Sequence, residues 1–191
     1  SVAHNLRNPL GSIRALAQGC LRSGNPDDIA PSLKTVMETV DRADRWLRDL
    51  LQGLKPIRLD RQPVKGLDSQ LHRIVEAVRV FSSKVEVELV TEIATDLPPI
   101  EIDIRRIEQS LIVLLNNAVE ASSAGDSVHM TVDFSEDELL LEVKDEGCGM
   151  SEEVQSRLFS PYFTTKKGGL GLGLSLTQRI IHGHGGRIDV V

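Results

Sequence analysis

The segment HNLRNPLGS, at residues 4–12, holds a histidine about one helical turn before a proline. Two interpretations fit it. Asn8 can be the N-cap of a helix whose first residue is Pro9, which leaves His4 in a frayed terminus, and capping preferences favour this interpretation. Alternatively, His4 is a nucleophile on a helix that continues through Pro9 and kinks there, because the proline ring removes a backbone donor and clashes with the carbonyl of Asn5.

The segment DEGCGM follows alternating apolar residues, which puts Asp145 at the end of a predicted strand. Gly147 and Gly149 allow the backbone to approach a ligand closely. The carboxylate is able to accept a hydrogen bond from an exocyclic amine such as that of adenine. An ordinary turn is the alternative.

The segment KKGGLGLGLSL places four glycines directly before a predicted helix. Amides at a helix N-terminus bind anions, and Lys166 and Lys167 add positive charge, so the segment suits a polyphosphate. Its spacing matches neither the Walker A motif nor a dinucleotide fingerprint, and a flexible linker is the alternative. The glycines are Gly168, Gly169, Gly171 and Gly173.

Two adjacent amides, Asn116 and Asn117, lie within an apolar helical pattern in LLNNAVEAS. Burying an amide without a partner costs about 1 to 3 kcal/mol, so such a residue has either a structural hydrogen bond or a ligand. Asn117 is able to supply an oxygen to Mg²⁺, a hard cation that bridges protein and phosphate oxygens. A helix asparagine with a structural hydrogen bond is the alternative.

The segment LFSPYFTTKK lies between the two glycine-rich segments. We expect its aromatic residues Phe159, Tyr162 and Phe163 to pack against the protein. Its polar residues, which include Thr164, Thr165 and Lys166, are expected to stay in solvent. This pattern is typical of a lid that moves over a bound nucleotide.

The helix that carries His4 belongs to a predicted helical hairpin. Apolar residues from Ile29 onward recur at alternating intervals of four and three, as in a coiled coil or helical bundle. The first helix has a weaker version of this seam, and SGNPDD separates the two helices. The seam residues are Ile29, Leu33, Val36, Val40, Ala43, Leu47, Leu50 and Leu54, preceded by Ala3, Leu6, Leu10, Ile13, Ala17 and Cys20.

Two helices of this length cannot enclose a core alone, so we predict that the hairpin pairs with a second copy in a dimeric four-helix bundle. In this register, His4 and Asn8 fall next to each other on the solvent side.

The chain after LKPIRLDRQP changes from helical seams to a mixture of elements. Helices are predicted over residues 67–81, 103–123 and 172–182. Strands are predicted from the alternation of Val85, Val87 and Leu89, over residues 128–134 and 139–143, and at GRIDVV. This mixture indicates an α+β fold with helices on one face of a mixed sheet. His182 and His184 are assigned to the end of the last helix, with a metal pair as the alternative.

The composition is that of a globular protein. The 191 residues carry 22 basic and 28 acidic side chains, with no basic stripe interleaved with aromatics, so nucleic acid is not an expected partner. Cys20 and Cys148 are too few and too distant for a disulfide framework or a zinc site, which suits a reducing compartment. No apolar run approaches the roughly 20 residues that span a bilayer, and no signal peptide is visible. We expect a cytoplasmic core that is a fragment of a longer protein. The sequence does not decide whether that longer protein is anchored in a membrane.

The motifs together resemble the H, N, G1, F and G2 boxes of sensor histidine kinases, in order and spacing. The five boxes correspond to HNLRNPL, NNAVEA, DEGCGM, LFSPYFTTK and GGLGLGL. These segments most resemble those of the nitrogen-regulation type of sensor kinase. The resemblance covers nearly the whole chain. It implies a helical hairpin for dimerisation and phosphotransfer at residues 1–56. An α+β sandwich of the histidine-kinase, gyrase and chaperone ATPase type would follow at residues 57–191.

The resemblance also implies roles for individual residues. His4 would be the phosphoacceptor that attacks the γ-phosphoryl group of ATP, and Asn8 would help to position water when a response regulator is dephosphorylated. Asn117 would bind Mg²⁺, and Asp145 would recognise adenine. The implied partners are a response-regulator receiver domain and a second copy that binds through residues 1–56. The other implied ATP-binding residues are Gly147, Gly149, Thr164, Thr165, Lys166, Gly169, Leu170, Gly171, Leu172, Gly173 and Leu174.

Three features depart from the family pattern. Asn5 replaces a usually acidic residue that would orient the imidazole ring and raise its basicity, so slower autophosphorylation is expected. Val113 replaces the usual first asparagine of the N box. The chain stops at Val191, where a further strand is normal, so the sheet is expected to lack an edge.

Two other hypotheses stay open. A gyrase-type or chaperone-type ATPase would use a carboxylate such as Glu120 to activate water, but it would leave HNLRNPL unexplained. A scaffold, or a protein biased towards phosphatase activity, would bind ATP without forming phosphohistidine.

Overall fold

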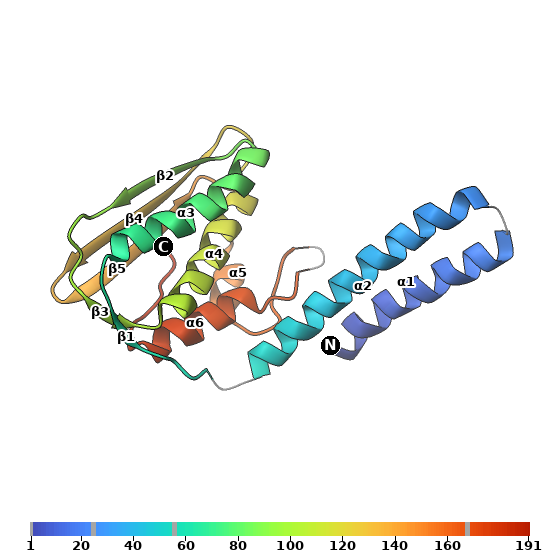
Figure 1. Ribbon diagram of the computed structural model, residues 1–191, viewed down its shortest axis with the longest axis horizontal. Coiled ribbons are helices and arrows are strands. Elements are labelled where there is room, and N and C mark those ends of the chain that lie inside the picture. Colours follow the sequence, from blue (N-terminus) through green and yellow to red (C-terminus); the bar gives the residue numbers. More distant parts are fainter. Residues whose placement is uncertain (1, 24–25, 55–56, 167–168) are drawn as a thin grey trace. The chain divides into compact units, whose positions relative to one another are not determined.

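The computed structural model describes residues 2–23, 26–54, 57–166 and 169–191 (Figure 1). Within these, side chains are described for residues 9–22, 29–41, 43–44, 57–166 and 169–191. The chain divides into two compact units, Ser1–Lys55 and Pro56–Val191. Each unit is a compact fold of its own.

The first unit is the predicted helical hairpin, formed by α1 (Val2–Ser23) and α2 (Pro26–Leu54) (Figure 1). Helix α1 runs through Pro9, so the prediction that Asn8 is an N-cap is wrong and the continuous helix is confirmed. An N-cap needs non-helical backbone, whereas the seam keeps one helical register on both sides of Pro9. The predicted solvent-facing positions of His4 and Asn8 concern side chains that lie outside the described ones, as does the side chain of Asn5.

The hairpin buries only part of its apolar seam. On α1, Ile13, Leu16 and Cys20 are half-buried, and Leu16 takes the place predicted for the exposed Ala17. On α2, Val36 and Ala43 are half-buried. Other residues of the seam are exposed to solvent, because two helices can bury only the side chains on the faces that they turn towards each other. The exposed apolar residues of the hairpin are Leu10, Leu21, Ile29, Leu33, Met37 and Val40.

The second unit is built on a three-stranded mixed sheet in the order β2-β4-β5. Strand β2 runs parallel to β4, and β5 runs antiparallel to β4. A separate antiparallel pair joins two short strands that the sequence did not predict. The strands are β1 (Gln62–Val64), β2 (Glu88–Ile93), β3 (Ile100–Ile102), β4 (Ser127–Ser135) and β5 (Glu138–Asp145).

Helices cover one face of this sheet (Figure 1). Strand β4 alternates as predicted, so that Val128, Met130 and Val132 are buried under the helices. Leu71 and Leu115 are fully buried on the helical side of this core. The α+β fold with a mixed sheet is therefore confirmed. The helices are α3 (Leu67–Lys84), α4 (Ile104–Ala121), the short α5 (Glu152–Arg157) and α6 (Gly173–Gly183).

Two strand predictions are wrong. Strand β2 begins at Glu88 instead of Val85, because Val85 and Glu86 form a turn at the end of α3, with Glu86 at φ 59°. GRIDVV forms no strand, and within the described residues β5 pairs only with β4. Alternating side chains specify the face of a strand, but a ladder also requires a neighbouring backbone with which to exchange hydrogen bonds.

The end of α6 is joined to the start of α4 through His184, the C-cap residue of α6. Its Nε2 accepts a hydrogen bond from the backbone N–H of Asp103 at 2.9 Å, and its Nδ1 donates to the carbonyl of Ile180 at 2.8 Å. Asp103 in turn is the N-cap of α4 and accepts from the backbone of Arg106. The placement of His182 and His184 at the helix end is confirmed. No helix within the described residues has the length and apolar character to cross a membrane.

Candidate functional site

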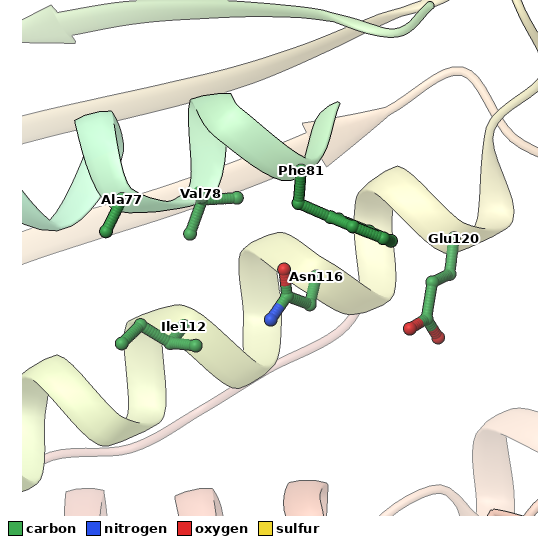
Figure 2. Close-up of a pocket in the computed structure, with 6 residues that line it drawn as sticks. All are labelled: Ala77, Val78, Phe81, Ile112, Asn116 and Glu120. Atoms are coloured by element: carbon green, nitrogen blue, oxygen red, sulfur yellow. The ribbon is translucent and has the colours of Figure 1, made fainter. Parts of the chain in front are cut away.

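Helix α4 presents its two adjacent amides to different neighbours. Asn116 lines a groove of about 320 Å³ between α3 and α4, with Phe81 across from it (Figure 2). Asn117 lies 100° further around the helix, and its Oδ1 accepts a hydrogen bond from Lys166 Nζ at 2.6 Å. Asn117 thus has a hydrogen-bond partner within the protein, on the segment predicted to be a lid. The groove is lined by Ala77, Val78, Phe81, Ile112, Asn116 and Glu120.

Lys166 joins the lid to α4 through two oxygen atoms. Besides Asn117, its ammonium contacts Oε2 of Glu120 in an ion pair, in which both side chains are a little under half exposed. Figure 2 shows the Glu120 carboxylate pointing away from Phe81 and away from the α3 side of the groove. Glu120 follows Asn117 by three residues, so the two side chains share one face of α4. Sequence analysis considered Glu120 only as a possible water-activating group, although its i, i+3 spacing from Asn117 was an available signal that the two side chains share a face.

The segment after β5 is fitted tightly against the end of α4. Asp145 Oδ1 accepts a hydrogen bond from Gly147 N at 3.0 Å. A Cβ added at Gly147 would lie 2.5 Å from the carbonyl oxygen of Ala121, and that oxygen also accepts from Cys148 N. Asp145 is exposed at this point. The structure thus brings the Asp145 segment and the Asn117 helix together.

The lid also contacts the loop before α6. Tyr162 N donates to the carbonyl of Gly171 at 2.9 Å. Gly171 has φ +63°, and a Cβ added there would lie 2.2 Å from the carbonyl oxygen of Phe163. Phe163 and Phe159 are half-buried as predicted, and Arg157 lies over the Phe163 ring at 4.5 Å. Tyr162 is 45% exposed, so the prediction that it packs down is wrong: its left-handed backbone, at φ 67°, directs the chain towards Gly171 instead.

The first turn of α6 has the character of an anion site. The N-cap residue is Leu172, which has no side-chain acceptor, and Ser175 Oγ donates to the Leu172 carbonyl. The backbone N–H groups at the start of the helix therefore lack a side-chain cap from Leu172. Val113 on α4 packs at this point, since a Cβ added at Gly173 would lie 3.0 Å from Val113 Cγ1.

The other predicted ATP-binding residues lie in the predicted lid or at the start of α6, apart from Gly149. Thr164 Oγ1 accepts from Lys166 N at 3.1 Å, and Gly169 N donates to the Lys166 carbonyl, so both backbone polar groups of Lys166 are hydrogen-bonded. Leu172 is buried, Leu170 and Leu174 are half-buried, and Thr165 is exposed. Gly149, in the other glycine segment, has φ +66°.

A second cavity, of about 240 Å³, lies on the outer face of the sheet and includes His129, Lys144 and Glu146. Neither this cavity nor the α3–α4 groove is lined by Asp145 or by residues 169–173. Hydrogen bonds from the backbone N–H and then the hydroxyl of Ser127 hold the pKa of Glu146 below its usual value, and the charges of His129 and Lys144 lower it further.

Comparison with known families places this arrangement in a class. Residues 1–52 match the family described as the His Kinase A (phospho-acceptor) domain. Residues 102–191 match the Histidine kinase-, DNA gyrase B-, and HSP90-like ATPase family. The chain therefore belongs to the sensor histidine kinases, as a catalytic core with a phospho-acceptor hairpin followed by an ATPase-type domain.

Individual relatives agree with this class. The chain is 35% identical to the signal transduction histidine-protein kinase AtoS of Escherichia coli K12, over 99% of this chain and 31% of AtoS. It is 34% identical to the sensor histidine kinase ZraS of the same strain, over 99% of this chain and 41% of ZraS. Against the sensory histidine kinase/phosphatase NtrB of Vibrio alginolyticus the identity is 33%, over 99% of this chain and 56% of NtrB. The chain thus spans between about a third and just over half of these curated relatives.

Solved structures share the fold. The histidine kinase ThkA, in its complex with the response regulator protein TrrA, superposes with a TM-score of 0.78 at 24% identity, over 97% of this chain and 54% of ThkA. The Acinetobacter baumannii histidine kinase AdeS gives a TM-score of 0.70 at 23% identity, over 94% of this chain and 86% of AdeS.

Proposed function

We propose that this core transfers the γ-phosphoryl group of ATP to His4 and then to an aspartate of a response-regulator receiver domain. The observation that carries the proposal is the presence, in one chain, of a phospho-acceptor domain that includes His4 and an ATPase-type domain that includes Asn117 and Asp145. The ThkA relative was crystallised with a response regulator, which supports the choice of partner.

The chemistry needs a nucleophile and charge neutralisation. At pH 7 a histidine with a pKa near 6.5 is mostly neutral, so an unprotonated imidazole nitrogen of His4 is able to attack the γ-phosphorus. The bond from this phosphorus to the β–γ bridging oxygen then breaks, ADP leaves, and the ring proton passes to solvent. Mg²⁺, when bound, supplies positive charge beside the phosphate oxygens, and Asn117 is its proposed ligand.

The remaining site residues have roles that follow from their positions. We assign recognition of the adenine amine to Asp145, whose carboxylate is exposed and fixed by its hydrogen bond to Gly147 N. The amides at the start of α6, with Gly169, Gly171 and Gly173, are proposed to bind the phosphates. Thr164, Thr165 and Lys166 belong to the proposed lid.

The hairpin is proposed to form a homodimer through residues 1–56. The exposed apolar side chains of Leu10, Leu33 and Met37 support this, since a second copy would cover them in a four-helix bundle. Phosphatase activity towards the regulator, with Asn8 positioning water, is part of the same proposal. Because the proposed substrate is ATP, we place this core in the cytoplasm.

The test is acid-labile labelling from γ-³²P-ATP and Mg²⁺. We expect label on the full chain and none on a His4→Gln variant. A His72→Gln variant is the matched control, because His72 is an exposed histidine on α3 whose ring is hydrogen-bonded to the Asp68 carbonyl of its own helix. Label that persists in His4→Gln would refute the assignment of the phosphoacceptor. Tight nucleotide binding without any phosphohistidine would favour the scaffold hypothesis instead.

A further inference from the structure

Two oxygen atoms on one face of α4 converge on a single cation. Oδ1 of Asn117 lies 2.6 Å from Lys166 Nζ, and Oε2 of Glu120 contacts the same ammonium. An amide oxygen and a carboxylate oxygen are the ligand types that Mg²⁺ takes from proteins. The donor set therefore fits a magnesium ion, and the ammonium shows that both oxygens reach one positive charge.

We propose that Glu120 is a second protein ligand of the Mg²⁺ that accompanies ATP, and that Lys166 holds the place of this ion on Asn117 and Glu120 in the nucleotide-free protein. The inference rests on the proposed function, because it assumes that Mg·ATP binds at this site.

The position one turn before Asn117 explains why the second oxygen comes from Glu120. Residues 113, 117 and 120 lie along one face of α4, at intervals of four and three. Val113 has no oxygen on its side chain, and its methyl group packs where α6 begins, against Gly173. Of these three positions, only 117 and 120 supply oxygen ligands.

Metal binding at these oxygens has a consequence for the lid. A divalent cation and the Lys166 ammonium cannot share the same two oxygens, because like charges in contact repel strongly. Displacing the Lys166 ammonium therefore breaks the contact that joins this residue to Asn117 and Glu120 on α4. The phosphates of ATP then offer the ammonium new oxygen partners. The exchange couples metal entry to the release of the lid from α4.

The test measures how strongly Mg²⁺ tightens nucleotide binding. The dissociation constant of a non-hydrolysable ATP analogue is determined for the full chain, once with Mg²⁺ and once with EDTA, by calorimetry. Glu120→Gln is expected to lose about tenfold of the Mg²⁺-dependent tightening, since a charged partner contributes more than a neutral one of the same shape. Its affinity in EDTA is expected to stay the same or to improve. Glu108→Gln, at an exposed position of the same helix α4, is the matched control and is expected to behave as the wild type.

A second variant separates a ligand from a residue that merely holds Lys166. Lys166→Met is expected to raise the affinity of the nucleotide-free chain for Mn²⁺ several-fold, measured by electron paramagnetic resonance, because the competing ammonium is gone. The matched control is Lys84→Met, an exposed lysine in the last turn of α3. If Glu120 did no more than position Lys166, Lys166→Met would instead show the same reduced effect of Mg²⁺ on the dissociation constant of the ATP analogue as Glu120→Gln.

The outcomes distinguish this inference from the proposed function. A wild-type chain that binds the analogue more tightly with Mg²⁺, together with a Glu120→Gln variant of unchanged metal dependence, overturns the inference and leaves the proposed function intact. Unchanged Mn²⁺ affinity in Lys166→Met overturns the part assigned to Lys166. A wild-type chain that binds no ATP analogue contradicts the proposed function and this inference together.

Discussion

Replacing Gly171 with alanine tests whether the lid is seated on the loop before α6. Gly171 has φ +63°, and a left-handed backbone costs a residue with a Cβ about 1 to 2 kcal/mol. The new Cβ would also lie 2.2, 2.5 and 2.6 Å from the O, C and N atoms of Phe163, all of them backbone. Steric overpacking of this kind costs roughly 1 to 3 kcal/mol. The expected loss for Gly171→Ala is therefore about 2 to 5 kcal/mol.

The matched control is Gly185→Ala. Gly185 also has a positive φ, of +87°, but a Cβ there meets nothing within 4 Å. This variant is expected to lose only the conformational part, about 1 to 2 kcal/mol. The difference between the two variants isolates the contact between Gly171 and Phe163.

The assay is urea unfolding followed by hydrogen exchange of peptides from α4 and α6. These peptides report on the Pro56–Val191 unit alone, so that the hairpin does not complicate the transition. Equal losses of unfolding free energy in Gly171→Ala and Gly185→Ala would show that Phe163 does not rest on Gly171, and would refute the seating of the lid.

Two further predictions concern the hairpin and the sheet. Leu33→Glu places a charge on the exposed apolar face of α2 and is expected to convert the proposed dimer into a monomer, measured by sedimentation. Lys34→Glu, at an exposed position that is already charged, is the control and is expected to leave the dimer intact. If both variants were monomers, or both were dimers, the result would contradict this interface. Ser127 lowers the pKa of Glu146 from 4.5, so this carboxylate stabilises the fold above about pH 4.5 and loses its contribution as the pH falls through the lowered folded-state pKa. Ser127→Ala removes the hydroxyl hydrogen bond but keeps the backbone hydrogen bond, which is the larger cause of the lowered pKa. The urea midpoint of this variant is therefore expected to fall slightly less as the pH is lowered than that of the wild type, and an unchanged fall would count against a contribution of the hydroxyl hydrogen bond.

Much of this protein follows from local patterns in its sequence. The four-three seam of α2, the apolar face of α4 and the alternation of β4 all predict their elements, because a residue's neighbours at helical or strand spacing decide which face it shares. The order of the five boxes identified the family. The glycine-rich segments were visible in the sequence, but the reasons for two of their glycines are tertiary: Gly147 lies against the Ala121 carbonyl, and Gly171 combines a left-handed backbone with a close approach to Phe163.

Other features depended on contacts between distant residues. GRIDVV has a strand pattern but no strand, and β1 pairs with β3 although neither was predicted. Lys166 contacts Asn117 and Glu120 across 49 and 46 positions of sequence. The sequence alone placed Lys166 near phosphate and left Glu120 as a possible base.

Periodicity in the sequence determined the helices and the alternation of β4, and the order of the motifs determined the family, because both depend on side chains that are close in sequence. The tertiary structure decided which seam residues stay exposed, which strands pair, and which oxygens meet the lysine of the lid. Those outcomes depend on how separate elements pack against one another, and a flexible lysine side chain takes its partners only after the helix and the loop that hold them have been brought together.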